Sequence, residues 1–414
     1  MLTESEQFMP AVRSSLQEVR RTLIELYAAV GADPDKPQDV SRRFKINRNL
    51  AWKLSRVIQS QESVEALNYL PGAQGMALAM RAFERAPGAG DAVSRVEASL
   101  DALGEVAERH AGSREQLELT LESMGLLQRE AKVESGRELA FRGNSSVWGV
   151  QARLRLACVF LAPSSQGPDR LDYVQVGGVL GFRRLNPGVR WRLALSNFHD
   201  DKGLPLPGLN GFEEFEEKGP GDPPMLIREF SSSNLPPIEV VNHPDGREFV
   251  LPAGPVGNIP SFDCLLGYVW RGLPAYRDAN NQYGSTGVAI SLPVESLLFD
   301  LIVHKDVPLA GRPEALIYGF PHGGAETPAS QTPSNLLNLR QELVELPSRP
   351  VTVATALVPN YSRIGARVYE RMGWNADDFL GLRLQVPYAP MSTRAVIRWA
   401  LPEAPDRAVS RAYG

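Results

Sequence analysis

The distribution of proline and glycine changes near residue 140, and this change most constrains what the chain can fold into. Residues 1–140 hold few prolines and much Ala, Leu, Glu and Arg, whereas residues 141–414 are rich in Pro, Gly and short apolar runs. Helices need long stretches without Pro and Gly, while short strands are commonly bounded by them. The sequence therefore predicts an α+β protein, with an all-helical N-terminal part followed by a large β-rich C-terminal region.

Apolar residues of the N-terminal part recur at alternating intervals of three and four, which is typical of helices with one buried stripe. The first stripe runs from Met9 to Val30, and the last ends at Met124. The final two helices are expected to form an antiparallel pair, whose stripe closes either on the rest of this part or on a second copy of the chain. The expected helices cover about 6–30, 38–45, 48–60, 91–110 and 114–130.

We divide the chain into three expected domains. Residues 1–62 form the first, and residues 63–135 form a helical connector that can serve as a dimerisation hairpin. Residues 141–414 form a β-rich α+β domain, with one helix expected at 362–373. The acidic, turn-rich sequence around 200–224 resembles a surface loop or linker, so this domain would split into two lobes near 200–235.

One internal similarity stands out in the β-rich region. Residues 296–321 align without gaps on residues 377–402, so that Leu301 meets Leu382 and Tyr318 meets Trp399. Each segment has the pattern strand, proline-containing turn, strand, which unrelated hairpins share by chance. The alternative is a duplication, which would imply a pseudo-symmetric β-fold.

Composition argues against a protein that is basic as a whole, a secreted protein and a membrane protein. The formal net charge is −4, so any binding to nucleic acid needs a local basic patch. Cys158 and Cys264 lie in apolar runs and are expected to be buried free thiols, with a disulfide between them as the alternative. The N-terminus lacks an apolar signal sequence, and no run approaches the roughly 18 apolar residues of a membrane span. We therefore expect a cytoplasmic protein that does not enter the membrane.

The most basic stretch is DVSRRFKINRNLAWKLSRVIQS, residues 39–60, with six Lys or Arg and one Asp. Residues 1–60 hold ten Lys or Arg against seven Asp or Glu, whereas residues 61–135 hold seven against thirteen. A solvated helix surface does not require such segregation of charge. On an ideal helix counted from Ile46, the apolar face holds Ile46, Leu50, Leu54 and Val57. The opposite side holds Arg48, Trp52, Ser55 and Arg56.

The stretch resembles the helix-turn-helix of DNA-binding regulators. The similarity lies in an apolar and a small residue of the first helix, an apolar residue ending the turn, and apolar anchors of the second helix: Val40, Ser41, Ile46, Leu50, Ala51 and Leu54. The sequence departs from the family at the turn, where Lys45 replaces the favoured Gly. A left-handed backbone would cost Lys about 1 kcal/mol relative to Gly, so the sequence leaves the geometry of this turn open.

The resemblance implies which residues contact DNA. Base-contacting positions of the family fall on Asn47, Arg48, Asn49, Trp52 and Lys53. Arg can recognise guanine and Asn can recognise adenine in the major groove. Nearby basic residues are expected to contact phosphates: Arg42, Arg43, Arg56 and Lys36. The indole of Trp52 either packs against the first helix, which we favour, or lies exposed and stacks.

Signals of an enzyme are weaker. His199, with Asp200 and Asp201, could meet His243 at a metal, but no HExxH or paired CxxC motif accompanies them. The segment FPHGG, which contains His322, is similar to the oxyanion segment of lipase-like hydrolases, yet the accompanying GxSxG motif is absent. We assign no catalytic residue, no metal ligand and no cofactor.

We therefore expect a transcriptional regulator that binds double-stranded DNA through a helix-turn-helix. Its C-terminal region would sense an unknown effector or assemble subunits, an expectation that depends on analogy. A homodimer would place its two recognition helices on a near-palindromic site. Two alternatives remain open. One is a scaffold whose basic helix binds an acidic partner, and the other is a hydrolase or metal-dependent enzyme in the β-rich region.

Overall fold

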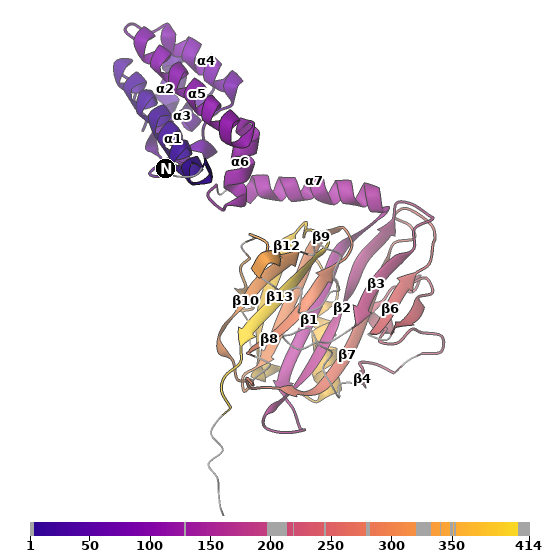
Figure 1. Cartoon of the computed structure of the whole chain (residues 1–414). Helices are drawn as coiled ribbons and strands as arrows, with labels where there is room; N and C mark the ends of the chain where they lie inside the picture. Colours follow the sequence, from indigo (N-terminus) through magenta and orange to yellow (C-terminus); the bar gives the residue numbers. More distant parts are fainter. Residues whose placement is uncertain are drawn as a thin grey trace, which may run out of the picture. The chain divides into compact units, whose positions relative to one another are not determined.

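The computed structural model describes residues 4–127, 130–196, 213–217, 219–243, 246–278, 282–319, 333–339, 341–347, 351 and 353–404. The chain divides into two compact units, Met1–Lys132 and Val133–Gly414, here called the helical unit and the β-rich unit. Helices make up the first and strands dominate the second, as Figure 1 shows, so the predicted α+β class is confirmed.

The helical unit has one core shared by all its helices. Residues from Val12 to Leu127 contribute to a single cluster of buried side chains, so the expected domains 1–62 and 63–135 pack as one body. The elements are α1 (Glu4–Ala29), α2 (Pro37–Phe44), α3 (Arg48–Gln59), the 3-10 helix η1 (Glu65–Asn68), α4 (Ala73–Glu84), α5 (Gly90–Ala111) and α6 (Arg114–Ser123).

The stripe of α1 is buried as predicted. Val12, Leu16, Val19, Leu23 and Leu26 are at most 1% exposed. On α5 and α6, the side chains of Val96, Leu117 and Leu121 are fully buried within the same core, so their stripe closes inside the unit. The prediction for Met124 was wrong: α6 ends at Ser123, because Gly125 turns the backbone into the left-handed region, and Met124 is 49% exposed.

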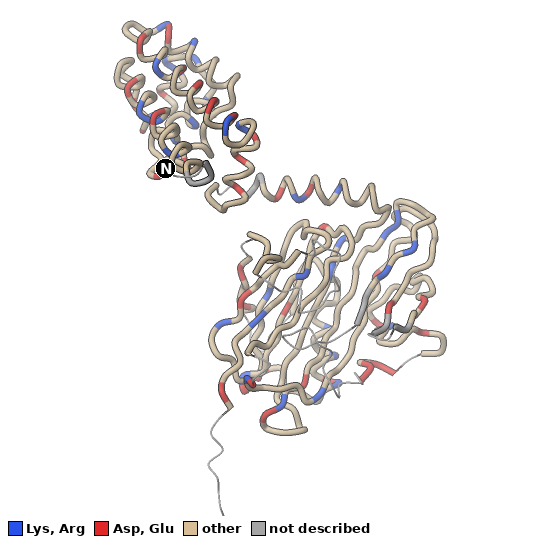
Figure 2. Tube along the Cα trace, in the orientation of Figure 1, with Lys and Arg blue, Asp and Glu red and all other residues tan. Residues whose placement is uncertain are grey.

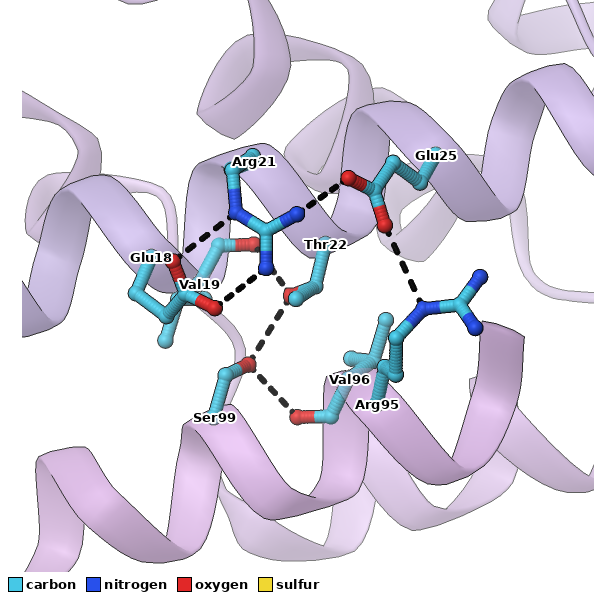
Figure 3. A network of polar contacts seen from close by, with 8 residues as sticks. All are labelled: Glu18, Val19, Arg21, Thr22, Glu25, Arg95, Val96 and Ser99. Carbon is cyan, nitrogen blue, oxygen red and sulfur yellow. Dashed lines mark hydrogen bonds and ion pairs between the residues drawn. The ribbon is translucent and has the colours of Figure 1, made fainter. Parts of the chain in front are cut away.

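Polar contacts between α1 and α5 fix the position of α1 (Figure 3). The hydroxyls of Thr22 and Ser99 lie 2.9 Å apart in the interior, and Ser99 also donates to the carbonyl oxygen of Val96. At the surface, Arg95 pairs with Glu25 at 3.2 Å. Because buried polar groups need partners, this pair of hydroxyls favours one alignment of the two helices.

The β-rich unit is built around a seven-stranded sheet of order β11-β12-β9-β1-β2-β7-β4, with two three-stranded sheets, β10-β13-β8 and β3-β6-β5. In the large sheet β1 and β9 run parallel, and its other neighbours run antiparallel. The strands are β1 (Val150–Pro163), β2 (Arg170–Arg184), β3 (Trp191–Ser196), β4 (Glu213–Glu214), β5 (Glu239–His243), β6 (Gly246–Leu251), β7 (Phe262–Pro274), β8 (Tyr283–Ile290), β9 (Val294–His304), β10 (Ala310–Gly319), β11 (Val344–Glu345), β12 (Phe379–Pro387) and β13 (Thr393–Ala400).

Both faces of the large sheet are covered. Successive side chains of a strand point to opposite faces of its sheet. On β1, Val159 joins the buried cluster that includes Ile317 and Ile397 of the β10-β13-β8 sheet, whereas Phe160 joins the buried cluster around α8. This helix, Tyr361–Met372, confirms the one predicted at 362–373. The other helical elements that the structure describes in this unit are α7 (Glu130–Trp148, beginning at the boundary with the helical unit), η2 (Arg228–Phe230), η4 (Pro333–Asn335) and η5 (Ala376–Asp378).

The unit does not split into two lobes near 200–235. Strands from either side of that segment, β2 and β7, pair directly, and β1 pairs with β9. The prediction was wrong because a turn-rich sequence does not reveal that its flanks return to one sheet. Cys158 of β1 and Cys264 of β7 are buried free thiols, as expected.

The two similar segments are not hairpins. The first supplies β9 and β10, the second supplies β12 and β13, and in each the strands belong to different sheets. The segments pair with each other instead: β9 with β12, where Leu301 lies opposite Leu382, and β10 with β13. Leu301 and Leu382 are the aligned residues that lie opposite each other, whereas Tyr318 pairs with Arg394 and not with its aligned residue Trp399. The pairing therefore leaves the choice between chance similarity and duplication open.

Candidate nucleic-acid interface

The second and third helices are joined by a tight left-handed turn. Lys45 follows α2 with φ 55° and ψ 36°, so the Lys backbone adopts the conformation that the family favours for Gly. The Ser41 hydroxyl donates to the carbonyl oxygen of Ile46 at 2.8 Å across the turn. Asn47 then caps α3, because its side-chain oxygen accepts from the Asn49 backbone N–H at 2.7 Å. These contacts fix where the first residues of α3 project.

An aromatic cluster holds the helix pair on its support. The ring centroids of Phe44, at the end of α2, and Phe83 of α4 are 4.6 Å apart, and those of Phe83 and Tyr27 of α1 are 5.6 Å apart. Burial raises the pKa of the Tyr27 hydroxyl to about 12. Arg20 of α1 donates to the carbonyl oxygen of Ile58 at 2.9 Å, which satisfies one carbonyl in the last turn of α3.

The buried side of α3 differs from the one predicted. Leu54 and Val57 are buried as predicted, but the buried side also includes Ala51, Ser55 and Ile58, and Leu50 is only partly buried. The prediction that Ser55 points outward was wrong, since its side chain is 2% exposed. The reason is geometric: Ile46 precedes the cap, so its side chain does not follow the 100° progression of the helix.

Most residues expected to contact bases are exposed. Asn47, Arg48, Asn49 and Trp52 are exposed, whereas Lys53 is partly buried. Within the described part of the chain, Arg48 and Lys53 form no ion pair or hydrogen bond through their side chains. The side-chain oxygen of Asn47 is occupied by the cap, so Asn49 is the asparagine whose amide is better placed to contact a base.

The residues expected to contact phosphates are exposed and have partners of their own. Lys36 pairs with Asp33 at 3.3 Å, and Arg42 pairs with Asp39 at 3.8 Å. Arg43 donates to the carbonyl oxygen of Gly31 at 2.8 Å. Exposed ion pairs of this kind contribute little free energy. Phosphate can therefore replace the carboxylates as the partner of Lys36 and Arg42.

The charge of the unit is mixed, yet locally basic. Figure 2 shows Lys and Arg interspersed with Asp and Glu along its helices. From Lys36 to Arg56 the sequence holds seven Lys or Arg and one Asp. The basic excess is therefore confined to α2, the turn and α3, as a local patch requires in a chain of net charge −4.

The position of Trp52 differs from the one we favoured. Its indole is 45% exposed rather than buried, and it meets the ring of Tyr69 edge-on, with ring centroids 5.7 Å apart. The guanidinium of Arg56 lies 5.1 Å from the centre of the same Tyr69 ring, and a hydrogen bond to Tyr69 raises the pKa of Arg56. Tyr69 was missed because the helix-turn-helix pattern ends before it.

The residues weighed for an enzyme do not form a site that the structure describes. His199, Asp200, Asp201 and His322 lie outside the described residues, as does the side chain of His243. Among the side chains that are described, no group of three or more His, Cys, Asp or Glu is arranged to hold a metal ion.

A buried polar cluster in the β-rich unit joins α8 to the large sheet. Asp300 of β9 is 0% exposed and accepts two hydrogen bonds from Arg383, at 2.8 and 2.7 Å, and one from the Tyr361 hydroxyl at 2.9 Å. Burial raises the pKa of Asp300, and burial likewise raises the pKa of the Cys158 thiol. Because Asp300 is closed to solvent, we assign the cluster a structural role.

Comparison with known proteins adds no assignment. No family model matches the chain, and no curated protein or solved structure matches it. Of the helices that the structure describes, none has the length and apolar character needed to cross a membrane.

Proposed function

We propose that this protein binds double-stranded DNA through α3 and regulates transcription. The observation that carries the proposal is the outer side of α3, where Arg48, Asn49, Trp52 and Arg56 are exposed on a helix that a left-handed turn and a buried face hold in place. An α-helix is about 10–12 Å across with its side chains, so α3 matches the major groove, which is about 12 Å wide.

The residues divide into two roles. Arg48 can donate two hydrogen bonds to the O6 and N7 atoms of guanine, and Asn49 can pair with the N6 and N7 atoms of adenine. Lys53 and Asn47 flank them. The cations Lys36, Arg42, Arg43 and Arg56 contact phosphates, which fixes the register of the protein on the duplex without selecting sequence.

The proposal includes a second function for the remainder of the chain. A homodimer would place two α3 helices on half-sites about 34 Å apart. The β-rich unit would sense an effector or assemble subunits, by analogy with regulators of this architecture.

The competing proposal, a scaffold that binds an acidic protein, predicts attraction to polyanions without preference for any base sequence.

The test is a binding titration with matched variants. Full-length protein is titrated into fluorescent duplexes selected from a random pool, and Arg48→Ala is compared with Arg109→Ala. Arg109 is an exposed cation that lies away from the candidate interface. Its neighbour His110 contacts Phe8 near the start of α1, whereas Arg43 of α2 contacts Gly31 just beyond the end of α1. Arg48→Ala should weaken binding to the selected site by about 1–3 kcal/mol, and Arg109→Ala should leave it unchanged. If Arg48→Ala weakens binding to the selected site no more than binding to unrelated duplexes, Arg48 does not read bases and the scaffold is favoured.

A further inference from the structure

Trp52 is an apolar side chain held in an exposed position on a basic surface. Its indole is 45% exposed, and it lies one turn beyond Arg48 on the outer side of α3. Large aromatic side chains contribute most when desolvated, and a monomer gains nothing from leaving half of an indole in water. The exposed part of Trp52 is therefore available to a ligand that contacts α3.

The ring of Tyr69 contacts two side chains of α3, those of Trp52 and Arg56. Trp52 and Arg56 are four residues apart and so lie on the same side of α3. The Tyr69 ring meets the indole edge-on at an interplanar angle of 88°, and the Arg56 guanidinium lies over the same ring. Ordering such side chains before binding removes an entropic cost from the binding step.

We propose, on the basis of the DNA binding proposed above, that Trp52 recognises the C5-methyl group of thymine and that Tyr69 is the positioning residue for this contact. Thymine is the one base that presents an apolar group in the major groove, and apolar side chains recognise it there. Arg56, which lies over the same ring, is left to contact a phosphate.

The test removes single methyl groups from the DNA. In the duplex selected by the wild-type protein, each thymine is replaced in turn by uracil, which differs only by the C5-methyl group. At one or two positions the affinity of the wild-type protein should fall about fourfold, which corresponds to about 0.8 kcal/mol for one buried carbon. This measurement needs no variant protein, so it does not depend on how a substitution affects folding.

Variants then assign the contact to residues. Trp52→Ala should bind the thymine and uracil duplexes equally at those positions. Tyr69→Ala should reduce the fourfold penalty, and Tyr69→Phe, which keeps the ring, should restore it. Because Tyr69 packs against the core of the helical unit, Tyr69→Ala should lower the unfolding temperature and is assayed below it. Tyr69→Phe should keep wild-type unfolding and wild-type binding to unrelated duplexes, and a merely structural loss in Tyr69→Ala would weaken the thymine and uracil duplexes equally without changing the penalty.

The outcomes separate the two proposals. If the wild-type protein selects a site and no uracil substitution weakens binding, or if the penalty persists in Trp52→Ala, thymine recognition is wrong while DNA binding stands. A selected site that contains no thymine overturns it equally. If the wild-type protein binds no duplex at all, both proposals fail.

Discussion

Replacement of Arg383 by Met should strongly destabilise the β-rich unit. Arg383 and Asp300 lie opposite each other on β12 and β9, and the Asp300 carboxylate is 0% exposed. The substitution removes both guanidinium hydrogen bonds and, among the residues that the structure describes, leaves the Tyr361 hydroxyl as the donor to this carboxylate. Leaving a buried charge without its partner typically costs about 3–5 kcal/mol. This is a large fraction of the roughly 5–15 kcal/mol that stabilises a domain.

The loss should depend on pH. Burial raises the folded-state pKa of Asp300, and the hydrogen bonds from Arg383 and Tyr361 lower it in part. Removal of Arg383 therefore raises this pKa further. A carboxyl with a raised folded pKa contributes stability below its unfolded pKa and loses that contribution as pH rises through the folded pKa. The deficit of Arg383→Met relative to wild type should therefore shrink as the pH is lowered from 7 toward 4.

The assay is urea unfolding of the full-length protein at several pH values, followed by tryptophan fluorescence. The double variant Asp300→Asn with Arg383→Met removes both charges of this pair, so at pH 7 it should recover a large part of the lost stability. The reasoning is refuted if Arg383→Met costs under about 1 kcal/mol at pH 7, or if its deficit is the same at every pH.

Three further predictions concern the helical unit. Lys45→Gly should be about 1 kcal/mol more stable than Lys45→Ala in denaturant unfolding, because only Gly adopts the left-handed turn without strain; the opposite order would contradict the turn geometry. With a folded pKa of about 12, Tyr27 loses its stabilising contribution as pH rises from 10 to 12, so wild type should lose about 1.4 kcal/mol more than Tyr27→Phe by pH 11. Identical pH profiles would refute this. A double-mutant cycle of Thr22→Val and Ser99→Ala should give a coupling of about 0.5–1.5 kcal/mol, and additive effects would show that the buried hydroxyl contact contributes nothing.

The sequence predicted the helical unit well because helices depend on local spacing. The stripe from Val12 to Val30 lies in the core, and α2 and α3 occupy the predicted segments. The orientation of α3 was less predictable, because a rotation of one residue decides whether Ser55 is buried. That rotation depends on where the helix begins, and the cap at Asn47 became evident only in the structure.

Non-local pairing accounts for most of what the sequence did not predict. β1 takes β9 as its parallel neighbour, and the many residues between them give no local sign of this pairing. Asp300 stands in an apolar run, and its partner Arg383 belongs to a strand far along the chain. At the candidate interface, Tyr69 lies beyond the helix-turn-helix and reaches Trp52 through the path of η1. No periodicity marks such contacts.

The most direct test of the proposed function is the affinity of the full-length protein for duplex DNA across a salt series. If α2 and α3 form the interface, log K should fall linearly with log salt, with a slope of about −0.9 for each phosphate contacted. The exposed cations Lys36, Arg42, Arg43 and Arg56 predict a slope of about −3.6 per protomer. Substituting one of them should reduce the slope by about one unit. Absence of binding by the folded protein at low salt would contradict the proposal.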